Sequence, residues 1–286
     1  MVRKMTQVLE VKGLSKHYPS FELKNVSFAL EKGRITGFIG RNGAGKSTTL
    51  NSLLNFVHPD SGEILFFGEN VKSREMEMKQ KIGFVSSGMA YYPNKKLKAV
   101  TKVTKSFYRE WDENAYQKYM KEFELDEDKT FRQLSMGMKI KYALALALSH
   151  NAELLILDEP TSGLDPVSRE NLLEIFMNLC DKGKTIFFST HITSDLDKCA
   201  DNIIYIRNGQ IVDKSALSEF VNTYKLVEYS ENELSAGQLQ MLIGKRRLKN
   251  GWTSLIRTEY AGEFEGKVSE ADLDAIMVHL ESEGTI

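Results

Sequence analysis

The segment Gly40–Ser47 combines residue types that suit phosphate chemistry. Its sequence, Gly-Arg-Asn-Gly-Ala-Gly-Lys-Ser, matches the pattern G-x-x-x-x-G-K-[ST] at every position. Glycines let backbone N–H groups curve around phosphate oxygens, and the start of a helix adds a partial positive charge. In this pattern the Lys46 ammonium would contact the β- and γ-phosphates of a nucleotide, and the Ser47 hydroxyl would bind Mg²⁺. The apolar stretch Ile35–Ile39 before the segment and the helical apolar spacing after it favour a phosphate site over an ordinary glycine-rich turn.

Two adjacent carboxylates follow an apolar run later in the chain. Leu154–Leu157 has the residue types of a buried strand, and Asp158 and Glu159 come directly after it. Asp158 could hold Mg²⁺ through its water shell, and Glu159 could orient and deprotonate an attacking water. Alone, such a pair at a strand end is more often simply solvated. Together with the Lys46 segment, it predicts hydrolysis of a nucleoside triphosphate.

Alternating strands and helices must position these two segments. Strands are predicted at Val8–Val11, Asn25–Leu30, Ile35–Ile39, Glu63–Phe67, Ile82–Val85, Leu154–Asp158 and Thr185–Ser189, and helices after Ser47, at Ser135–His150 and at Pro166–Cys180. The dipeptide Asn208-Gly209 predicts a hairpin between Ile203–Ile206 and Gln210–Asp213. This alternation continues to about Tyr224 and predicts a three-layer α/β core.

Two regions differ from this core in character. Between about residues 88 and 133, aromatic and charged residues are dense, and we expect an inserted helical subdomain. Residues 225–286 carry none of the nucleotide motifs and predict a small α+β appendage, with strands at Leu226–Tyr229 and Thr253–Arg257. Ser269 is expected to cap a helix over Ala271–Leu280. We expect this appendage to be regulatory or to stabilise a dimer.

Composition limits the class of protein. The 286-residue chain has 42% hydrophobic and 27% charged residues, which suits a folded protein with a sizeable core. Its 38 Lys and Arg nearly balance its 39 Asp and Glu, so the net charge does not indicate a nucleic-acid partner. No stretch reaches the ~18 apolar residues of a membrane-spanning helix, the N-terminus lacks the apolar core of a secretory signal, and Cys180 and Cys199 have no metal-ligand spacing. We therefore expect a cytosolic chain that does not itself span a membrane.

Further motifs occur in order around these two segments. They are Leu134-Ser135-Met136-Gly137-Met138 before a predicted helix, Ser162-Gly163-Leu164-Asp165 after the carboxylates, and Ser189-Thr190-His191 at a strand end. Their order and spacing resemble the nucleotide-binding subunit of an ATP-binding cassette (ABC) transporter, from about Val8 to Tyr224. The resemblance implies a P-loop NTPase-like core with an N-terminal antiparallel β subdomain. It divides the chain into a nucleotide-binding domain, residues 1–224, and the appendage, residues 225–286.

The resemblance also implies roles for individual residues, with ATP and Mg²⁺ as the ligands. Tyr18 would stack on adenine, and His191 would stabilise the developing charge near the γ-phosphate. Ser135 and Gly137 would contact the ATP held by an opposite subunit, and Asp165 would lie across the same interface. The expected nucleotide-binding residues are therefore Tyr18, Gly40, Asn42, Gly43, Ala44, Gly45, Lys46, Ser47, Thr48, Ser135, Gly137 and Asp165; the expected catalytic residues are Glu159, His191 and Lys46, and the expected metal-binding pair is Ser47 and Asp158.

The sequence departs from the family pattern at two places. The common signature Leu-Ser-Gly-Gly-Gln is interrupted here by Met136 and Met138, although Ser135 and Gly137 remain. A glutamine that reaches the metal and the water in the family is replaced by Ser87, whose side chain is shorter and could act only through a water. This second difference bears on metal coupling and turnover rate, and not on nucleotide binding.

The resemblance implies an ATPase that dimerises on ATP, as two copies of this chain, and drives a separate transmembrane permease subunit. Such a chain would be peripheral, at the cytoplasmic face of the membrane. The short insert and the Leu-Ser-x-Gly-Met signature resemble export cassettes of the bacitracin-resistance and antimicrobial-peptide type, so export of a peptide or hydrophobic compound is expected. The alternative is an ATP-switched ABC protein without a transport role, either a dimerisation module or a soluble remodelling ATPase.

The permease would dock between the core and the helical insert. In this family that position implies contacts at Gly88–Val103, including Tyr91, Tyr92 and Pro93. A group of basic residues nearby could face anionic lipid, although a solvated face is the simpler interpretation; it comprises Lys95, Lys96, Lys98, Lys102 and Lys105. The basic segment Lys245–Lys249 is interpreted in the same way, so no nucleic-acid partner is expected.

Overall fold

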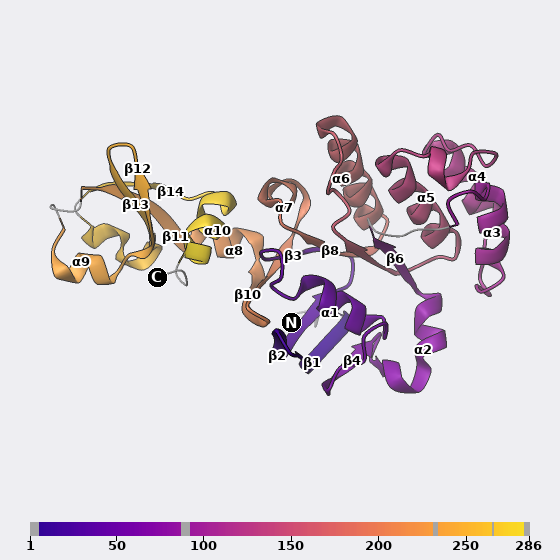
Figure 1. Ribbon diagram of the computed structural model, residues 1–286, viewed down its shortest axis with the longest axis horizontal. Coiled ribbons are helices and arrows are strands. Elements are labelled where there is room, and N and C mark those ends of the chain that lie inside the picture. The colour runs from indigo at the N-terminus through magenta and orange to yellow at the C-terminus, as the bar shows by residue number, and fades with distance from the viewer. Residues whose placement is uncertain (1–5, 87–91, 231–233, 265, 283–286) are drawn as a thin grey trace, which may run out of the picture. The chain divides into compact units, whose positions relative to one another are not determined.

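The computed structural model describes residues 6–86, 92–230, 234–264 and 266–282 (Figure 1). The chain divides into two compact units. The large unit comprises Met1–His191 and Cys199–Lys214, and the C-terminal unit comprises Ile192–Lys198 and Ser215–Ile286. The units thus divide between Lys214 and Ser215, and a domain boundary at Tyr224 stays a prediction. The predictions made above for Ser87 and Tyr91 lie outside the described residues.

A four-stranded antiparallel sheet forms the N-terminal part of the large unit. Its strands are β1 (Gln7–Tyr18), β2 (Phe21–Glu31), β4 (Ser61–Phe66) and β5 (Glu69–Asn70), in the order β2-β1-β4-β5. Buried and more exposed residues alternate along parts of β1 and β2, as in strands that bury one face. The antiparallel β subdomain expected from the sequence is therefore confirmed.

A six-stranded sheet forms the centre of the large unit. Its strands are β3 (Ile35–Ile39), β6 (Ile82–Ser86), β7 (Leu154–Asp158), β8 (Thr185–Thr190), β9 (Asn202–Arg207) and β10 (Gln210–Ala216), in the order β10-β9-β3-β8-β7-β6. Strands β9, β3, β8, β7 and β6 run parallel to one another. Asn208 and Gly209 both have positive φ, at 49° and 75°, as a tight hairpin between β9 and β10 requires.

Helices cover both faces of the six-stranded sheet. Helix α1 (Lys46–Leu53) lies between the two sheets, where Leu50 and Leu53 share one buried core with side chains of both. Helix α5 (Met136–Ser149) packs on β6 and helix α6 (Pro166–Asp181) on β3 and β8, on the side opposite α1 (Figure 1). These layers confirm the predicted α/β core. In the described part of the chain, no helix is both long enough and apolar enough to cross a membrane.

The expected helical insert lies between β6 and α5. It contains α3 (Leu97–Lys105), α4 (Glu113–Glu122) and the 3-10 helix η1 (Phe131–Gln133). A buried hydroxyl cluster joins it to the core, since Oγ1 of Thr101 is 2.9 Å from the hydroxyl of Tyr116 and 2.8 Å from that of Tyr142 in α5. A helix that the sequence did not indicate, α2 (Val71–Gln80), precedes β6. It buries little beyond Val71 and Met78, so its apolar periodicity is weak.

The C-terminal unit is a small α+β fold, as expected. Its antiparallel sheet has the order β12-β13-β11-β14, formed by β11 (Tyr224–Tyr229), β12 (Ile243–Leu248), β13 (Gly251–Arg257) and β14 (Lys267–Glu270). Helix α10 (Leu273–Ser282) packs on β12 and β13 and buries Leu273, Ile276 and Leu280. The shorter helices are α7 (Thr193–Cys199), α8 (Leu217–Asn222), α9 (Ala236–Gln240) and η3 (Thr258–Glu263).

The helix cap predicted at Ser269 is wrong. Ser269 lies in β14, where it pairs with Leu226 of β11, and the helix begins only at Leu273. The Asp272 carboxylate caps this helix instead, because it accepts a hydrogen bond of 2.8 Å from the backbone N–H of Ala275. Strand pairing beside β11 therefore outweighs the local capping preference of Ser269.

Candidate active site

The candidate site lies at one edge of the parallel strands. Gly40 follows β3, Glu159 follows β7 and His191 follows β8, and these three strands are neighbours. Because parallel strands end at the same edge, motifs far apart in the sequence meet there. A cleft of about 620 Å³ opens at this edge. It is lined by Ser20, Phe21, Arg41, Asn42, Gly43, Gly45, Lys46, Ser47, Thr48, Glu159, Ser162 and His191.

The glycine-rich loop requires glycine for two different reasons. A Cβ on Gly40 would lie 2.3 Å from the backbone oxygen of Ile206, so close strand packing excludes any side chain there. Gly45 has φ of 112° as the residue before α1, and a Cβ on it would lie 2.7 Å from Cδ2 of Leu23. The buried Ala44 packs beneath the loop, where its Cβ is close to the position that a Gly40 Cβ would take. The loop thus leads directly into a helix start, an arrangement that binds anions.

Lys46 is 5% exposed and points back over this loop. Its Nζ donates to the backbone oxygen of Gly40 at 2.6 Å and to that of Arg41 at 3.3 Å. It also lies 3.3 Å from Oε1 of Glu159. The loop carbonyls therefore hold the ammonium inside the cleft, next to a carboxylate of a distant motif.

The two carboxylates at the end of β7 face different partners. Oδ1 of Asp158 accepts a 3.3 Å hydrogen bond from the hydroxyl of Ser47. Oε2 of Glu159 lies 2.7 Å from Nδ1 of His191. The backbone of Glu159 is left-handed, with φ of 50°, at the point where the partners of the two carboxylates change. The structure therefore separates an oxygen pair suited to a cation from a carboxylate suited to proton transfer.

These groups fit a nucleotide with Mg²⁺. A hydroxyl and a carboxylate, here Ser47 and Asp158, are oxygen ligands of the kind that Mg²⁺ binds alongside nucleotide phosphates. Lys46 and His191 both contact the Glu159 carboxylate, which shows that this part of the cleft accommodates negative charge. In the described ranges, no cluster of three or more His, Cys, Asp or Glu side chains could hold a metal by itself.

Most of the predicted phosphate-binding residues line the cleft, and others lie elsewhere. Tyr18 ends β1 outside the lining, with the Lys16 ammonium 5.8 Å from its ring centroid. Ser135 and Asp165 cap helices: the Ser135 side chain accepts from Met138 N at 3.2 Å, and Asp165 accepts from Ser168 N at 3.0 Å. Gly137 lies in the first turn of α5. Tyr18, Ser135, Gly137 and Asp165 are therefore not brought to this cleft within one chain.

Several residues at the site were not assigned a role from the sequence. Ser20, in the turn after β1, and Phe21, the first residue of β2, line the cleft. Phe21 pairs with Tyr18 across the two strands, a register that the sequence alone did not reveal. Arg41 lies inside the glycine-rich pattern, and Ser162 belongs to a motif that was recognised. Ser189 contacts both acidic residues, which no local pattern indicates.

Known proteins resemble this chain in sequence and in fold. Residues 23–162 match the family described as ABC transporter. The chain is 31% identical over 241 residues to the bacitracin transport ATP-binding protein BcrA of Enterococcus faecalis, covering 82% of this chain and 77% of that protein. It is 34% identical to the linearmycin resistance ATP-binding protein LnrL of Bacillus subtilis, covering 72% of this chain and 68% of that protein.

A solved structure has the same architecture. It is a dimeric post-hydrolysis state of an ATP-binding cassette bound to ADP and Pi, 26% identical, with a TM-score of 0.64 over 73% of this chain and 98% of that one. The glycine-rich loop, the acidic pair and the histidine thus meet in a fold shared with nucleotide-bound cassettes. The chain belongs to the ATP-binding subunits of ABC transporters, a family of ATPases.

Proposed function

We propose that this chain drives export of a peptide or other hydrophobic compound, as one of two identical ATP-binding subunits on a separate transmembrane permease. The observation that supports the catalytic assignment is the contact of Glu159 with both Lys46 and His191 at the edge where β3, β7 and β8 end. The export assignment rests on relatives named for bacitracin transport and linearmycin resistance. A subunit of this kind would lie at the cytoplasmic face of the membrane, attached through its permease.

The proposed mechanism assigns one task to each side chain. Lys46 and the loop N–H groups bind the phosphates, and Ser47 and Asp158 hold Mg²⁺, which supplies charge neutralisation when bound. Glu159 accepts the proton of the attacking water on a carboxylate oxygen. His191 orients that carboxylate by donating from Nδ1 over 2.7 Å. Its other ring nitrogen would stabilise the developing charge as a donor in the imidazolium form, in which both ring nitrogens carry a proton.

The proposed dimer uses a glycine, Gly137, that serves no packing need within one chain. A Cβ on Gly137 would meet only Ser168 Cβ at 3.7 Å and Leu164 Cδ2 at 3.8 Å, which is ordinary contact. The fold of this chain therefore does not require glycine there. We take this as support for a close approach of Gly137, together with Ser135 and Asp165, to the ATP of a second subunit.

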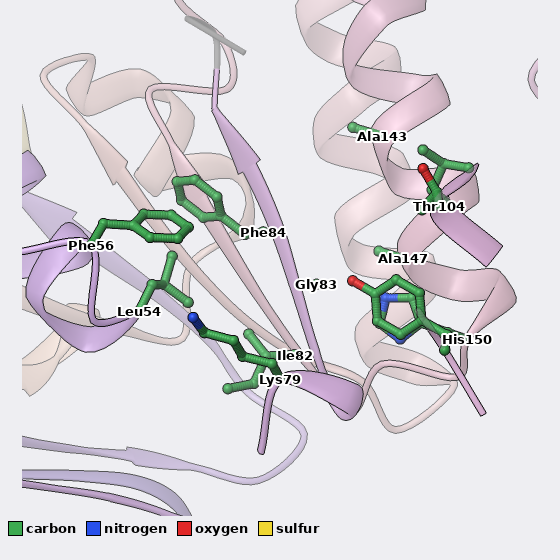
Figure 2. A pocket seen from close by; sticks show the side chains of 12 residues that line it. Leu54, Phe56, Lys79, Ile82, Gly83, Phe84, Thr104, Ala143, Ala147 and His150 are labelled. Carbon is green, nitrogen blue, oxygen red and sulfur yellow. The ribbon is translucent and has the colours of Figure 1, made fainter. Parts of the chain in front are cut away.

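A hollow between the core and the helical insert is the proposed docking site for the permease (Figure 2). Its volume is about 210 Å³, and its lining is mostly apolar: Leu54, Phe56, Lys79, Ile82, Gly83, Phe84, Thr104, Tyr108, Ala143, Leu146, Ala147 and His150. Phe56, 61% exposed, packs edge-on against Phe84 with ring centroids 5.8 Å apart. Exposed aromatic surface beside a hollow suits the apolar face of a short helix from the permease. Of the docking segment expected from the sequence, the described residues 92–103 do not line this hollow.

The C-terminal unit is proposed to regulate this cycle. Helix α7 begins two residues after His191 and clusters with the C-terminal unit, where Oγ1 of Thr193 donates to Oδ1 of Asp274 at 3.1 Å. A rearrangement of α10 would thus reach His191 through the chain itself. An Asp274→Ala variant with unchanged ATPase rate, assembly and transport would contradict this role.

Two measurements test the whole proposal: co-purification with a membrane partner, and the sensitivity of cells to peptide antibiotics. The chain should co-purify from membranes with a permease of about six spanning segments, and its loss should increase sensitivity to peptide antibiotics. Phe56→Glu should abolish co-purification and keep the ATPase rate, whereas Val212→Glu, at an exposed position of β10, should change neither. ATPase activity with no membrane partner in these experiments would favour the non-transport alternative.

A further inference from the structure

Ser189 contacts both acidic residues of the site through one hydroxyl. Its Oγ donates a 2.7 Å hydrogen bond to Oδ1 of Asp158. The same Oγ accepts a 3.0 Å hydrogen bond from the backbone N–H of Glu159. A backbone N–H can only donate and a carboxylate oxygen can only accept, so the direction of both bonds is determined: the Ser189 proton points to Asp158.

The parallel register of two strands creates this contact. Asp158, the last residue of β7, pairs with Ser189 of β8, and the two strands end side by side. Ser189 is fully buried, whereas Asp158 and Glu159 are partly exposed and Glu159 lines the cleft. Water therefore does not compete for the hydroxyl, and loss of the hydroxyl would remove the partner of the Glu159 N–H.

The hydrogen bond from the backbone N–H of Glu159 to Ser189 lies between the two carboxylate-bearing residues. Glu159 has the left-handed φ of 50°, which is unfavourable for a residue with a side chain and persists only where its surroundings hold it. The bond from Glu159 N–H to Ser189 holds the peptide that joins Asp158 to Glu159. In the described chain, both hydrogen bonds to the Asp158 side chain, from Ser47 and Ser189, reach Oδ1. Oδ2 therefore stays available to a ligand.

We propose that Ser189 is a positioning residue for ATP hydrolysis, which aims the Asp158 carboxylate at the metal and the Glu159 carboxylate at the attacking water. This inference rests on the proposed roles of Asp158 and Glu159. It assigns to Ser189 no contact with substrate. Removal of its hydroxyl should misalign both carboxylates and leave the phosphate-binding loop intact.

The test compares Ser189→Ala and Ser189→Thr in the full chain. We expect Ser189→Ala to lower kcat by about 10- to 100-fold, as loss of an outer hydrogen-bond partner does at metal sites. Binding of a fluorescent ATP analogue without Mg²⁺ should stay within about twofold of wild type, while the gain in affinity on adding Mg²⁺ should shrink. Ser189→Thr keeps a hydroxyl on Cβ and should restore most of the rate and of the Mg²⁺ effect.

The matched control is Ser149→Ala, which removes another fully buried hydroxyl, bonded to the backbone oxygen of Ala145 at 2.5 Å, away from the cleft. It should keep kcat and the Mg²⁺ effect. The role of Ser189 would be overturned if Ser189→Ala hydrolyses ATP as fast as an active wild type, or if Ser149→Ala loses as much activity as Ser189→Ala. Either result would leave the proposed function unaffected. A wild-type chain that neither binds nor hydrolyses ATP would overturn the proposed function itself.

Discussion

Oε2 of Glu159 lies 2.7 Å from Nδ1 of His191, although 32 positions separate the two residues in the sequence. Oε1 of the same carboxylate lies 3.3 Å from Nζ of Lys46. One side chain thus contacts the residue that follows β8 and the first residue of α1. The consequences of these contacts can be measured separately for the proton-transfer step, for phosphate binding and for dimerisation.

Glu159→Gln is expected to trap a closed, ATP-bound dimer. The amide keeps the size of the side chain and can still accept from His191, but it cannot take a proton from water, so hydrolysis should fall by about 100-fold or more. Size-exclusion chromatography with MgATP should show a dimer. Glu153→Gln, which alters a carboxylate paired with Lys32 and Lys81, should behave as wild type. A Glu159→Gln chain that stays monomeric would argue against the assigned role.

Lys46→Ala should weaken nucleotide binding itself. Loss of a charge-assisted contact costs about 1.5–3 kcal/mol, which corresponds to an affinity about 10- to 150-fold lower. Equilibrium binding of ATP measures this directly. Lys32→Ala removes an exposed lysine paired with Glu153 and should leave the affinity unchanged. Undiminished affinity in Lys46→Ala would remove the phosphate-loop assignment.

Gly137→Ala separates folding from dimerisation. A Cβ fits here with its nearest neighbour at 3.7 Å, and alanine favours a helix over glycine by about 1 kcal/mol, so thermal stability should hold or rise. ATP-dependent dimerisation and the ATPase rate should nevertheless fall, because the Cβ would meet the second subunit. Gly237→Ala in α9, where the added Cβ is also unobstructed, is the helical control with normal activity. Normal dimerisation of Gly137→Ala would contradict the proposed contact.

Stability of the large unit should depend on the protonation of His150. Burial lowers the pKa of His150 to about 4, so the folded chain binds fewer protons there than the unfolded chain, whose ordinary pKa is 6.5. The contribution of neutral His150 to the free energy of unfolding is fully present above pH 6.5 and is lost as pH falls toward 4. The full loss amounts to roughly 3 kcal/mol.

His150→Phe keeps the ring that stacks on Tyr108, at 3.7 Å between centroids, and cannot be protonated. Urea unfolding at pH 7.5 and 4.5 should therefore show a smaller acid effect in His150→Phe than in wild type. The same comparison for the exposed His58→Gln should reproduce the wild-type effect. Identical acid effects in all three chains would exclude His150 as the source.

The C-terminal unit should have the opposite pH response at Asp197. Burial, with the nearby charges of Asp272 and Asp274, raises the pKa of Asp197. The folded unit therefore binds a proton more readily than the unfolded chain, and stability falls as pH rises through the raised pKa. Asp197→Asn should raise the melting temperature of this unit at pH 7 and give no gain at pH 3. A gain of equal size at both pH values would contradict this cause.

Local patterns in the sequence determined a large part of the fold. The buried strands, the Asn208-Gly209 hairpin and the glycine-rich loop each depend on residues that are neighbours in the sequence. Apolar periodicity and turn sterics act over a few residues, so the sequence alone carries them. The short helix α2 was not predicted because it buries only Val71 and Met78, so its sequence lacks a clear apolar periodicity.

Contacts between distant strands were decided only by the tertiary structure. Gly40 must be glycine because Ile206 of β9 passes beside it, and Ser189 reaches Asp158 because β7 and β8 pair in one register. Ser269 joins a sheet edge and leaves capping to Asp272. Strand register and close packing depend on residues far apart in the chain. These residues pair as they do because that arrangement buries the apolar side chains of the whole core. No window of the sequence contains that information.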